Sequence, residues 1–162
     1  MKLSVVDSDL AEWFSNFERV VIVGVGNPLR HDDDAGIELV RRLKEKILRS
    51  TILLIESETV PEDFIEPIVE FEPSHILIID AAIMDIEPGS MKLVEPSSTS
   101  EVAISTHMLP IQIFSDYLTK TTKAKIGLLL IQPENVDFGE GLSPKLRVAV
   151  ERLVDALLRI LR

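Results

Sequence analysis

Residues 20–36 have the sequence VVIVGVGNPLRHDDDAG, and the predicted fold class follows from this segment. Its first six residues form a continuous run of apolar side chains and glycine, which is typical of a strand buried on both faces. After a turn that contains Gly26 and Pro28, apolar side chains recur every three or four residues from Asp34 to about Leu48, as in an amphipathic helix. Such a succession of buried strand, short turn and helix is typical of an α/β domain.

Further short apolar runs alternate with helix-period segments along the rest of the chain. The sequence predicts strands at residues 20–25, 52–55, 76–80, 91–94 and 125–131, and helices at residues 9–17, 34–48, 61–71, 110–119 and 144–160, the last capped by Ser143. Pro67 is expected to kink or split the third helix. The Pro88-Gly89 turn indicates a tight connection, which favours an antiparallel fourth strand. We therefore expect residues 1–162 to form one three-layer α/β/α sandwich around a mostly parallel five-stranded sheet with one antiparallel strand.

Composition excludes several classes of protein. The chain has 17 basic and 27 acidic residues, a formal charge of −10, and no basic cluster of the kind that nucleic acids require. It has no cysteine, which excludes disulfides, thiolate metal sites, iron–sulfur clusters and a cysteine nucleophile. No apolar run approaches the length of a membrane span, and the first nine residues turn acidic where a signal peptide would be apolar. We expect a cytoplasmic protein with no nucleic-acid partner and no membrane insertion.

Candidate functional residues lie where the predicted strands end, because ligands of open α/β sheets bind beyond the carboxyl ends of the strands. Three features occupy such positions: the acidic residues 32–34, Asp80 at the end of the third strand, and His107 directly before a helix. Helix capping, turn formation and loop hydrogen bonding are the ordinary explanations for each of them. A helix amino terminus also favours a neutral imidazole at His107, the form that binds metals. Two carboxylates and one imidazole can hold a divalent transition ion and leave positions open, so the sequence predicts a cleft that binds a metal.

The glycines after the first strand do not indicate a nucleotide site. The third glycine of a dinucleotide fingerprint would stand at Leu29, and an acidic triplet is electrostatically wrong beside a pyrophosphate. We expect these glycines to form a tight turn beneath the acidic loop. The other histidines, His31 and His75, are expected at the surface without a role.

Four motifs occur in an order that resembles the [NiFe]-hydrogenase maturation endopeptidases. They are Gly24-x-Gly26-Asn27-x-Leu29-x-x-Asp32-Asp33-x-x-Gly36, then Leu77-Ile78-Ile79-Asp80-Ala81-Ala82 with Pro88-Gly89, then Ser105-Thr106-His107-Met108-Leu109-Pro110, and finally Ile131-Gln132-Pro133-Glu134. The third and fourth motifs are most similar to the branch that serves formate-hydrogenlyase-type, energy-converting hydrogenases.

The resemblance implies a protease that removes the C-terminal extension of a [NiFe]-hydrogenase large-subunit precursor after nickel has been inserted. Asp33, Asp80 and His107 would then be the catalytic and metal-contacting residues, and the nickel would belong to the substrate, with no organic cofactor. Asp32 and Asp34 would start the helix or support the metal-contacting residues.

The loop after the second strand departs from the family pattern. Relatives often carry a Gly-Gly pair where this chain has Ser57-Glu58 before Thr59. Together with Asn27, these three residues are the expected contacts to the substrate.

Two readings without proteolysis stay open. A non-catalytic metal-binding or chaperone protein can share the fold, because function depends on the site and not on the architecture. A phosphoacceptor receiver module would also carry acids after its first and third strands. However, a glycine-rich turn separates the first strand from Asp32 and Asp33, and Gln132-Pro133 follows the fifth strand where a receiver has a lysine.

Overall fold

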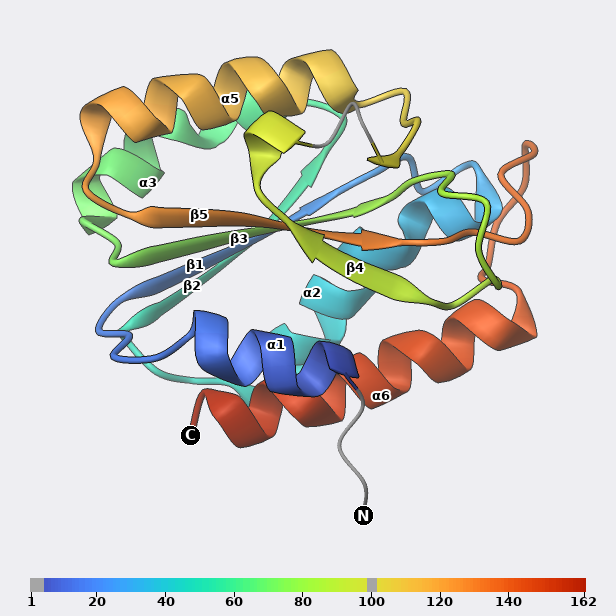
Figure 1. Cartoon of the computed structure of the whole chain (residues 1–162), viewed down its shortest axis with the longest axis horizontal. Coiled ribbons are helices and arrows are strands. Elements are labelled where there is room, and N and C mark those ends of the chain that lie inside the picture. The colour runs from blue at the N-terminus through green and yellow to red at the C-terminus, as the bar shows by residue number, and fades with distance from the viewer. Residues whose placement is uncertain (1–4, 99–101) are drawn as a thin grey trace.

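The computed structural model describes residues 5–98 and 102–162. Its strands form one five-stranded sheet in the order β2-β1-β3-β5-β4 (Figure 1). The strands are β1 (Val20–Val25), β2 (Ile52–Glu58), β3 (His75–Ala81), β4 (Met91–Val94) and β5 (Lys125–Ile131). All neighbouring pairs are parallel except β4 with β5, which confirms the predicted sheet with its one antiparallel strand.

Helices cover both faces of the sheet. They are α1 (Val5–Trp13), α2 (Ala35–Lys46), α3 (Ile65–Phe71), α5 (Met108–Thr121) and α6 (Pro144–Ile160), with short 3₁₀ helices η1 (His31–Asp34), η2 (Pro61–Phe64) and η3 (Pro96–Ser98). Figure 1 shows α1, α2 and α6 on one face and α3 and α5 on the other, so the three-layer prediction is confirmed. None of the helices in the described ranges is long and apolar enough to cross a membrane.

The apolar core consists of two clusters, one on each face of the sheet. In β1, Val20 and Ile22 belong to the cluster under α1, α2 and α6, whereas Val21 and Val23 belong to the cluster under α3 and α5. Successive side chains of a strand point to opposite faces, so a strand covered on both sides must be apolar at every position. This requirement explains the unbroken apolar runs of the sequence.

Two predicted helices differ substantially from the observed ones, whereas the bounds of the other helices differ by at most two residues at each end. The first helix spans Val5–Trp13 rather than residues 9–17, because Val6 and Leu10 both pack on the core and draw the earlier residues into the helix. The predicted helix at residues 61–71 is split, but at Phe64–Ile65 and ahead of Pro67. Pro67 is the third residue of α3, where its missing N–H removes no intrahelical hydrogen bond.

Two glycines allow the first turn of α2 to lie against the sheet. A Cβ on Gly24 of β1 would overlap the backbone oxygen of Gly36, and a Cβ on Gly36 would overlap the oxygen of Ile79 in β3. These glycines therefore permit close packing between helix and strands, beyond the tight turn that the sequence suggested. The packing holds η1, directly before α2, over the carboxyl ends of β1 and β3.

Candidate active site

Asp33, Asp80 and His107 converge at the carboxyl edge of the sheet. Asp33 lies in η1 after β1, Asp80 is the penultimate residue of β3, and His107 directly precedes α5. One potential ligand atom from each residue lies within 4.8 Å of the other two. All three are buried, with Asp80 fully inaccessible and Asp33 and His107 each 5% exposed. The structure thus brings together the three residues that the sequence singled out.

Hydrogen bonds order the cluster. Asp33 Oδ2 accepts the backbone N–H of Asn27 at 2.9 Å and lies 2.9 Å from His107 Nε2. The hydroxyl of Ser105 donates to Asp80 Oδ2 at 2.6 Å and accepts the backbone N–H of His107 at 3.1 Å. Ser105 therefore links two of the three residues. Sequence reasoning missed this link, for which the two-residue spacing to His107 was the only signal.

The cluster has one unsatisfied acceptor. Among the described residues, Asp80 Oδ1 is buried and has no hydrogen-bond partner, which is unfavourable for a carboxylate oxygen. A divalent cation would satisfy this oxygen together with the Asp33 carboxylate and the His107 imidazole. The donor set of two oxygens and one nitrogen fits a transition ion with open coordination positions.

The surroundings of Asp80 and His107 shift the pKa values of both side chains. Burial raises the pKa of Asp80 to about 7, although His107 and the Ser105 hydrogen bond act in the opposite direction. Burial by itself lowers the pKa of His107, but the Asp33 hydrogen bond and the charges of Asp80 and Asp33 outweigh it and raise the pKa. This differs from the expectation that the helix terminus keeps His107 neutral, because the neighbouring carboxylates favour the imidazolium.

Asp32 fastens the loop after β5 to η1. It is fully buried, and its carboxylate accepts the backbone N–H groups of Glu134, Asn135 and Ser143 at 2.7–2.9 Å. The Ser143 hydroxyl also donates to Asp32, at 2.7 Å, and makes no capping hydrogen bond to α6. Ser143 is the N-cap residue of α6, as predicted, but its hydroxyl completes the Asp32 site instead of bonding to the first turn of the helix.

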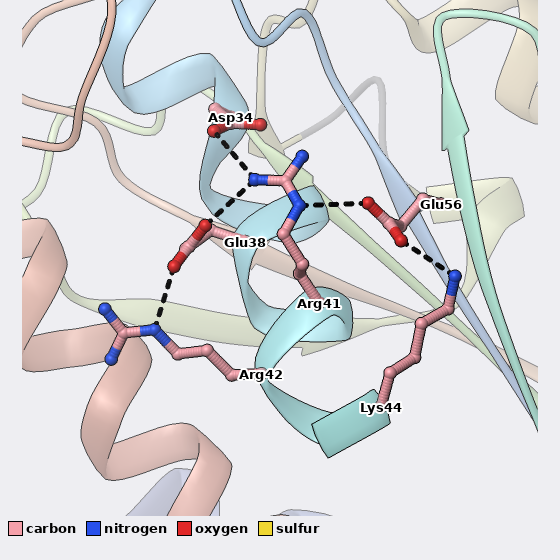
Figure 2. A network of polar contacts seen from close by, with 6 residues as sticks. All are labelled: Asp34, Glu38, Arg41, Arg42, Lys44 and Glu56. Carbon is pink, nitrogen blue, oxygen red and sulfur yellow. Dashed lines mark hydrogen bonds and ion pairs between the residues drawn. The ribbon is translucent and has the colours of Figure 1, made fainter.

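Asp34 points toward Arg41, in the network of ion pairs between α2 and β2 (Figure 2). It lies 4.0 Å from Arg41, which also contacts Glu38 and Glu56. Burial raises the pKa of Asp34 to about 6, against the effect of Arg41. The three adjacent aspartates therefore have different surroundings. Asp32 bonds to the loop after β5, Asp33 belongs to the cluster, and Asp34 lies near Arg41 of α2.

The expected substrate contacts lie around the same strand ends. Asn27 contributes its backbone N–H to Asp33, and its side chain accepts the N–H of Leu29 at 3.0 Å. Ser57 is buried and donates its hydroxyl to the oxygen of Gly24 at 3.1 Å, so its side chain stabilises the ends of β1 and β2. Glu58 and Thr59 are exposed.

Glu58 has a φ of 51°, a backbone conformation that favours glycine. The main chain at this position therefore suits the Gly-Gly pair that the resembling proteins often carry.

The two remaining histidines lie outside the cluster. His31 bonds through Nδ1 to the oxygen of Gly141 at 3.0 Å and so helps to hold the loop after β5. His75 is buried between Trp13 and Phe14, so its predicted surface position is wrong. It begins β3 at the opposite edge of the sheet, where α1 covers it.

A groove on the described surface lies apart from the cluster. It has a volume of about 640 Å³ and runs between α1, α6 and the turn before β4, with Val6, Met91 and Val148 among its lining residues. The cluster is instead nearly closed, and a ligand must reach it from the loops at the carboxyl edge.

Comparison with known proteins gives a consistent result. Residues 37–160 match a family model described as hydrogenase maturation protease. The chain is 36% identical over 159 residues to a putative hydrogenase maturation protease of Methanocaldococcus jannaschii, with 94% of each sequence covered. It is 30% identical over 138 residues to the hydrogenase 3 maturation protease of Escherichia coli, covering 85% of this chain and 87% of the relative.

Solved structures agree with these sequence matches. The crystal structure of a [NiFe] hydrogenase maturation protease HycI from Thermococcus kodakarensis superposes with a TM-score of 0.88 at 32% identity, over 94% of this chain and 98% of that one. The crystal structure of a hydrogenase 3 maturation protease superposes with a TM-score of 0.72 at 28% identity, over 85% of this chain and 87% of that one.

Proposed function

Because the chain belongs to the hydrogenase maturation protease family, we propose that this endopeptidase removes the C-terminal extension of a [NiFe]-hydrogenase large-subunit precursor after nickel insertion. The observation that carries the proposal is the buried cluster of Asp33, Asp80 and His107, whose donor atoms lie within 4.8 Å of one another. The similarity to hydrogenase 3 maturation proteases supports a substrate from the formate-hydrogenlyase or energy-converting class.

In this proposal the nickel is part of the substrate. A set of two carboxylates and one imidazole, without thiolates, suits a transient contact to nickel better than permanent storage. The precursor's own cysteines would supply the softer ligands. Contact with Asp33, Asp80 and His107 would then report that nickel is present before the peptide bond is cut.

Asp80 would act either as a nickel contact through Oδ1 or as the base that accepts the proton of an attacking water, since one oxygen cannot do both at the same time. Its Oδ1 has no partner among the described residues, and burial brings its pKa to about 7, close to the value that general-base catalysis requires at neutral pH. Asp33 is held by Asn27 and His107 and is oriented for metal contact. Nickel in the precursor would supply Lewis-acid polarisation of the water or of the scissile carbonyl.

The test uses purified large-subunit precursors with their C-terminal extensions, each prepared with and without nickel. Intact-mass spectrometry after incubation with this protein reports loss of the C-terminal peptide. We expect cleavage of the nickel-loaded form only. Cleavage of both forms would confirm the protease activity but contradict the proposal that the cluster detects nickel. Cleavage of neither form would favour a binding or chaperone protein on the same fold.

The variants His107→Ala and Asp33→Asn are expected to lower the cleavage rate at least about 100-fold, since each removes a residue that touches the reacting centre. Asp34→Asn is the matched control, because it changes the adjacent carboxylate, which faces Arg41, and should cleave at a rate close to wild type. Circular dichroism checks that all three variants are folded. A normal rate for His107→Ala would contradict the assignment of the site.

A further inference from the structure

Helix α5 is apolar on two faces. Ile111, Phe114 and Leu118 are fully buried against the sheet. On the outer side, Leu109, Ile113 and Tyr117 follow one another at four-residue spacing and are 67%, 57% and 50% exposed. Side chains four apart share one face of a helix, and a surface helix normally carries polar residues there. The outer stripe therefore has the character of a face that a partner covers.

This stripe begins at the candidate active site. Leu109 is the second residue after His107, and α5 runs from there along the outside of the molecule (Figure 1). The apolar surface continues on the other side of His107 at Ile104, which is 74% exposed and next to Ser105. Ile104 forms an antiparallel bridge with Ile83, which is 45% exposed and lies three residues after Asp80. Apolar side chains thus extend outward from two of the three cluster residues.

We propose that Ile83, Ile104, Leu109, Ile113 and Tyr117 form a docking surface for the folded body of the large-subunit precursor; this inference rests on the proposed function. A protein whose peptide bond lies over Asp80 and His107 must extend across the surface that adjoins them. The segment from Leu109 to Tyr117 is about 12 Å long along the helix axis. It is therefore long enough to contact the folded body of a protein, in addition to the peptide segment that is cut. The precursor would contribute apolar side chains of its own.

A second copy of this chain is a less suitable occupant. Ile104 and Leu109 flank His107 in the sequence, so a copy seated on them would lie across the approach to the cluster and compete with the substrate. The surface must be open when the protease binds its precursor. This requirement favours the precursor as the partner.

The test is the cleavage of nickel-loaded precursor by Ile113→Asp, with Ile113→Ser as a milder variant. We expect KM to rise at least tenfold for Ile113→Asp and less for Ile113→Ser, with kcat within about twofold of wild type, because Ile113 contacts neither Asp33, Asp80 nor His107 in the proposed mechanism. Leu48→Asp is the matched control, since Leu48 is 93% exposed and follows α2 at the opposite edge of the sheet. Its KM should equal that of wild type.

The outcomes separate the docking surface from the proposed function. If the wild type cleaves a precursor while Ile113→Asp retains the wild-type KM, the docking surface is wrong and the protease stands. If the wild type cleaves none of the large-subunit precursors of its organism, both proposals are overturned. Light scattering decides the remaining case: a wild-type dimer that Ile113→Asp dissociates, with KM unchanged, would identify a second copy as the occupant and overturn the docking surface.

Discussion

Ser105 donates its hydroxyl hydrogen to Asp80 Oδ2 and accepts the backbone N–H of His107. It touches neither the proposed metal nor the peptide bond, so it acts by positioning. A carboxylate with two rotatable bonds needs such a partner to hold one orientation, and partners of metal-contacting residues often matter nearly as much as the ligands themselves. Among the described side chains, the Ser105 hydroxyl is the hydrogen-bond partner of Asp80 Oδ2, so it helps to fix the orientation of this carboxylate.

Replacement of Ser105 by alanine is expected to lower kcat for precursor cleavage about 10- to 100-fold. Ser105→Thr restores the hydroxyl and should return kcat to within a few fold of wild type. The thermal midpoint of both variants separates this effect from a loss of folding. Wild-type turnover by Ser105→Ala would show that Asp80 is positioned without the hydroxyl.

At the level of elements, Asp32 is the buried side chain that anchors the loop between β5 and α6. Beside the hydrogen bonds to Asp32, the backbone N–H of His31 bonds to the oxygen of Gly139 at 2.8 Å, and the N–H of Gly139 bonds to the oxygen of Leu29 at 2.8 Å. The loop and the segment before η1 therefore form one unit. Its integrity determines where the neighbouring Asp33 lies.

Asp32→Asn is expected to lower the free energy of unfolding by about 3 kcal/mol, since hydrogen bonds to a charged group contribute about 1.5–3 kcal/mol each. The amide group of asparagine would present N–H to a donor at one of the two oxygen positions, because both accept hydrogen bonds from the chain. Urea denaturation gives the value. A change below about 1 kcal/mol would contradict the role of Asp32 as the anchor of the loop.

Asp34→Asn serves as the comparison in the same denaturation experiment. Oδ1 of Asp34 is buried without a partner among the described residues, and its ion pair with Arg41 is long, at 4.0 Å. Loss of this long, half-exposed ion pair has little effect, while loss of a poorly solvated charge is favourable. We expect a change of less than about 1 kcal/mol.

On the scale of the whole molecule, the two edges of the sheet have different roles. The carboxyl edge carries the buried, partly unsatisfied cluster, whereas the amino edge is closed by α1. There His75 stacks on Phe14 with ring centroids 6.0 Å apart and bonds to the Ser74 hydroxyl at 3.0 Å. Burial, with a smaller contribution from Lys125, lowers the pKa of His75 below its ordinary value of 6.5. The folded protein therefore holds this imidazole neutral.

This lowered pKa makes stability depend on pH with a definite sign. Below about pH 6.5 the unfolded chain binds a proton at His75 that the folded protein does not, so the His75 contribution to stability is present above that pH and is lost as the pH falls. The slope from one such group is at most about 1.4 kcal/mol per pH unit. The raised pKa values of Asp34, Asp80 and His107 act in the opposite direction, so the wild-type profile alone does not isolate His75.

His75→Gln provides the isolation, because every other group is common to both proteins. We expect the unfolding free energy of wild type, taken relative to that of His75→Gln, to decrease between pH 7 and pH 5, as measured by urea denaturation at each pH. Parallel pH profiles would mean that His75 titrates normally in the folded protein.

The strands of the sheet and the positions of the candidate site residues at their ends follow from local sequence patterns. Strands covered on both faces must be apolar throughout, so β1, β3 and β5 could be recognised from composition alone. The turn at Pro88-Gly89 indicated the antiparallel β4. Asp33, Asp80 and His107 stood out because each follows or ends such an element, and parallel strands bring their carboxyl ends to one edge.

Contacts between residues that are far apart in the sequence depend on the tertiary structure. Asp32 bonds to residues 102 to 111 positions away, Ser105 bonds to a strand 25 positions away, and His75 is buried by a helix that precedes it by 62 positions or more. The exposure of Leu109, Ile113 and Tyr117 on α5 is likewise set by the tertiary structure. Local patterns encode the period of an element and the number of its covered faces, but they do not encode which distant segment covers them.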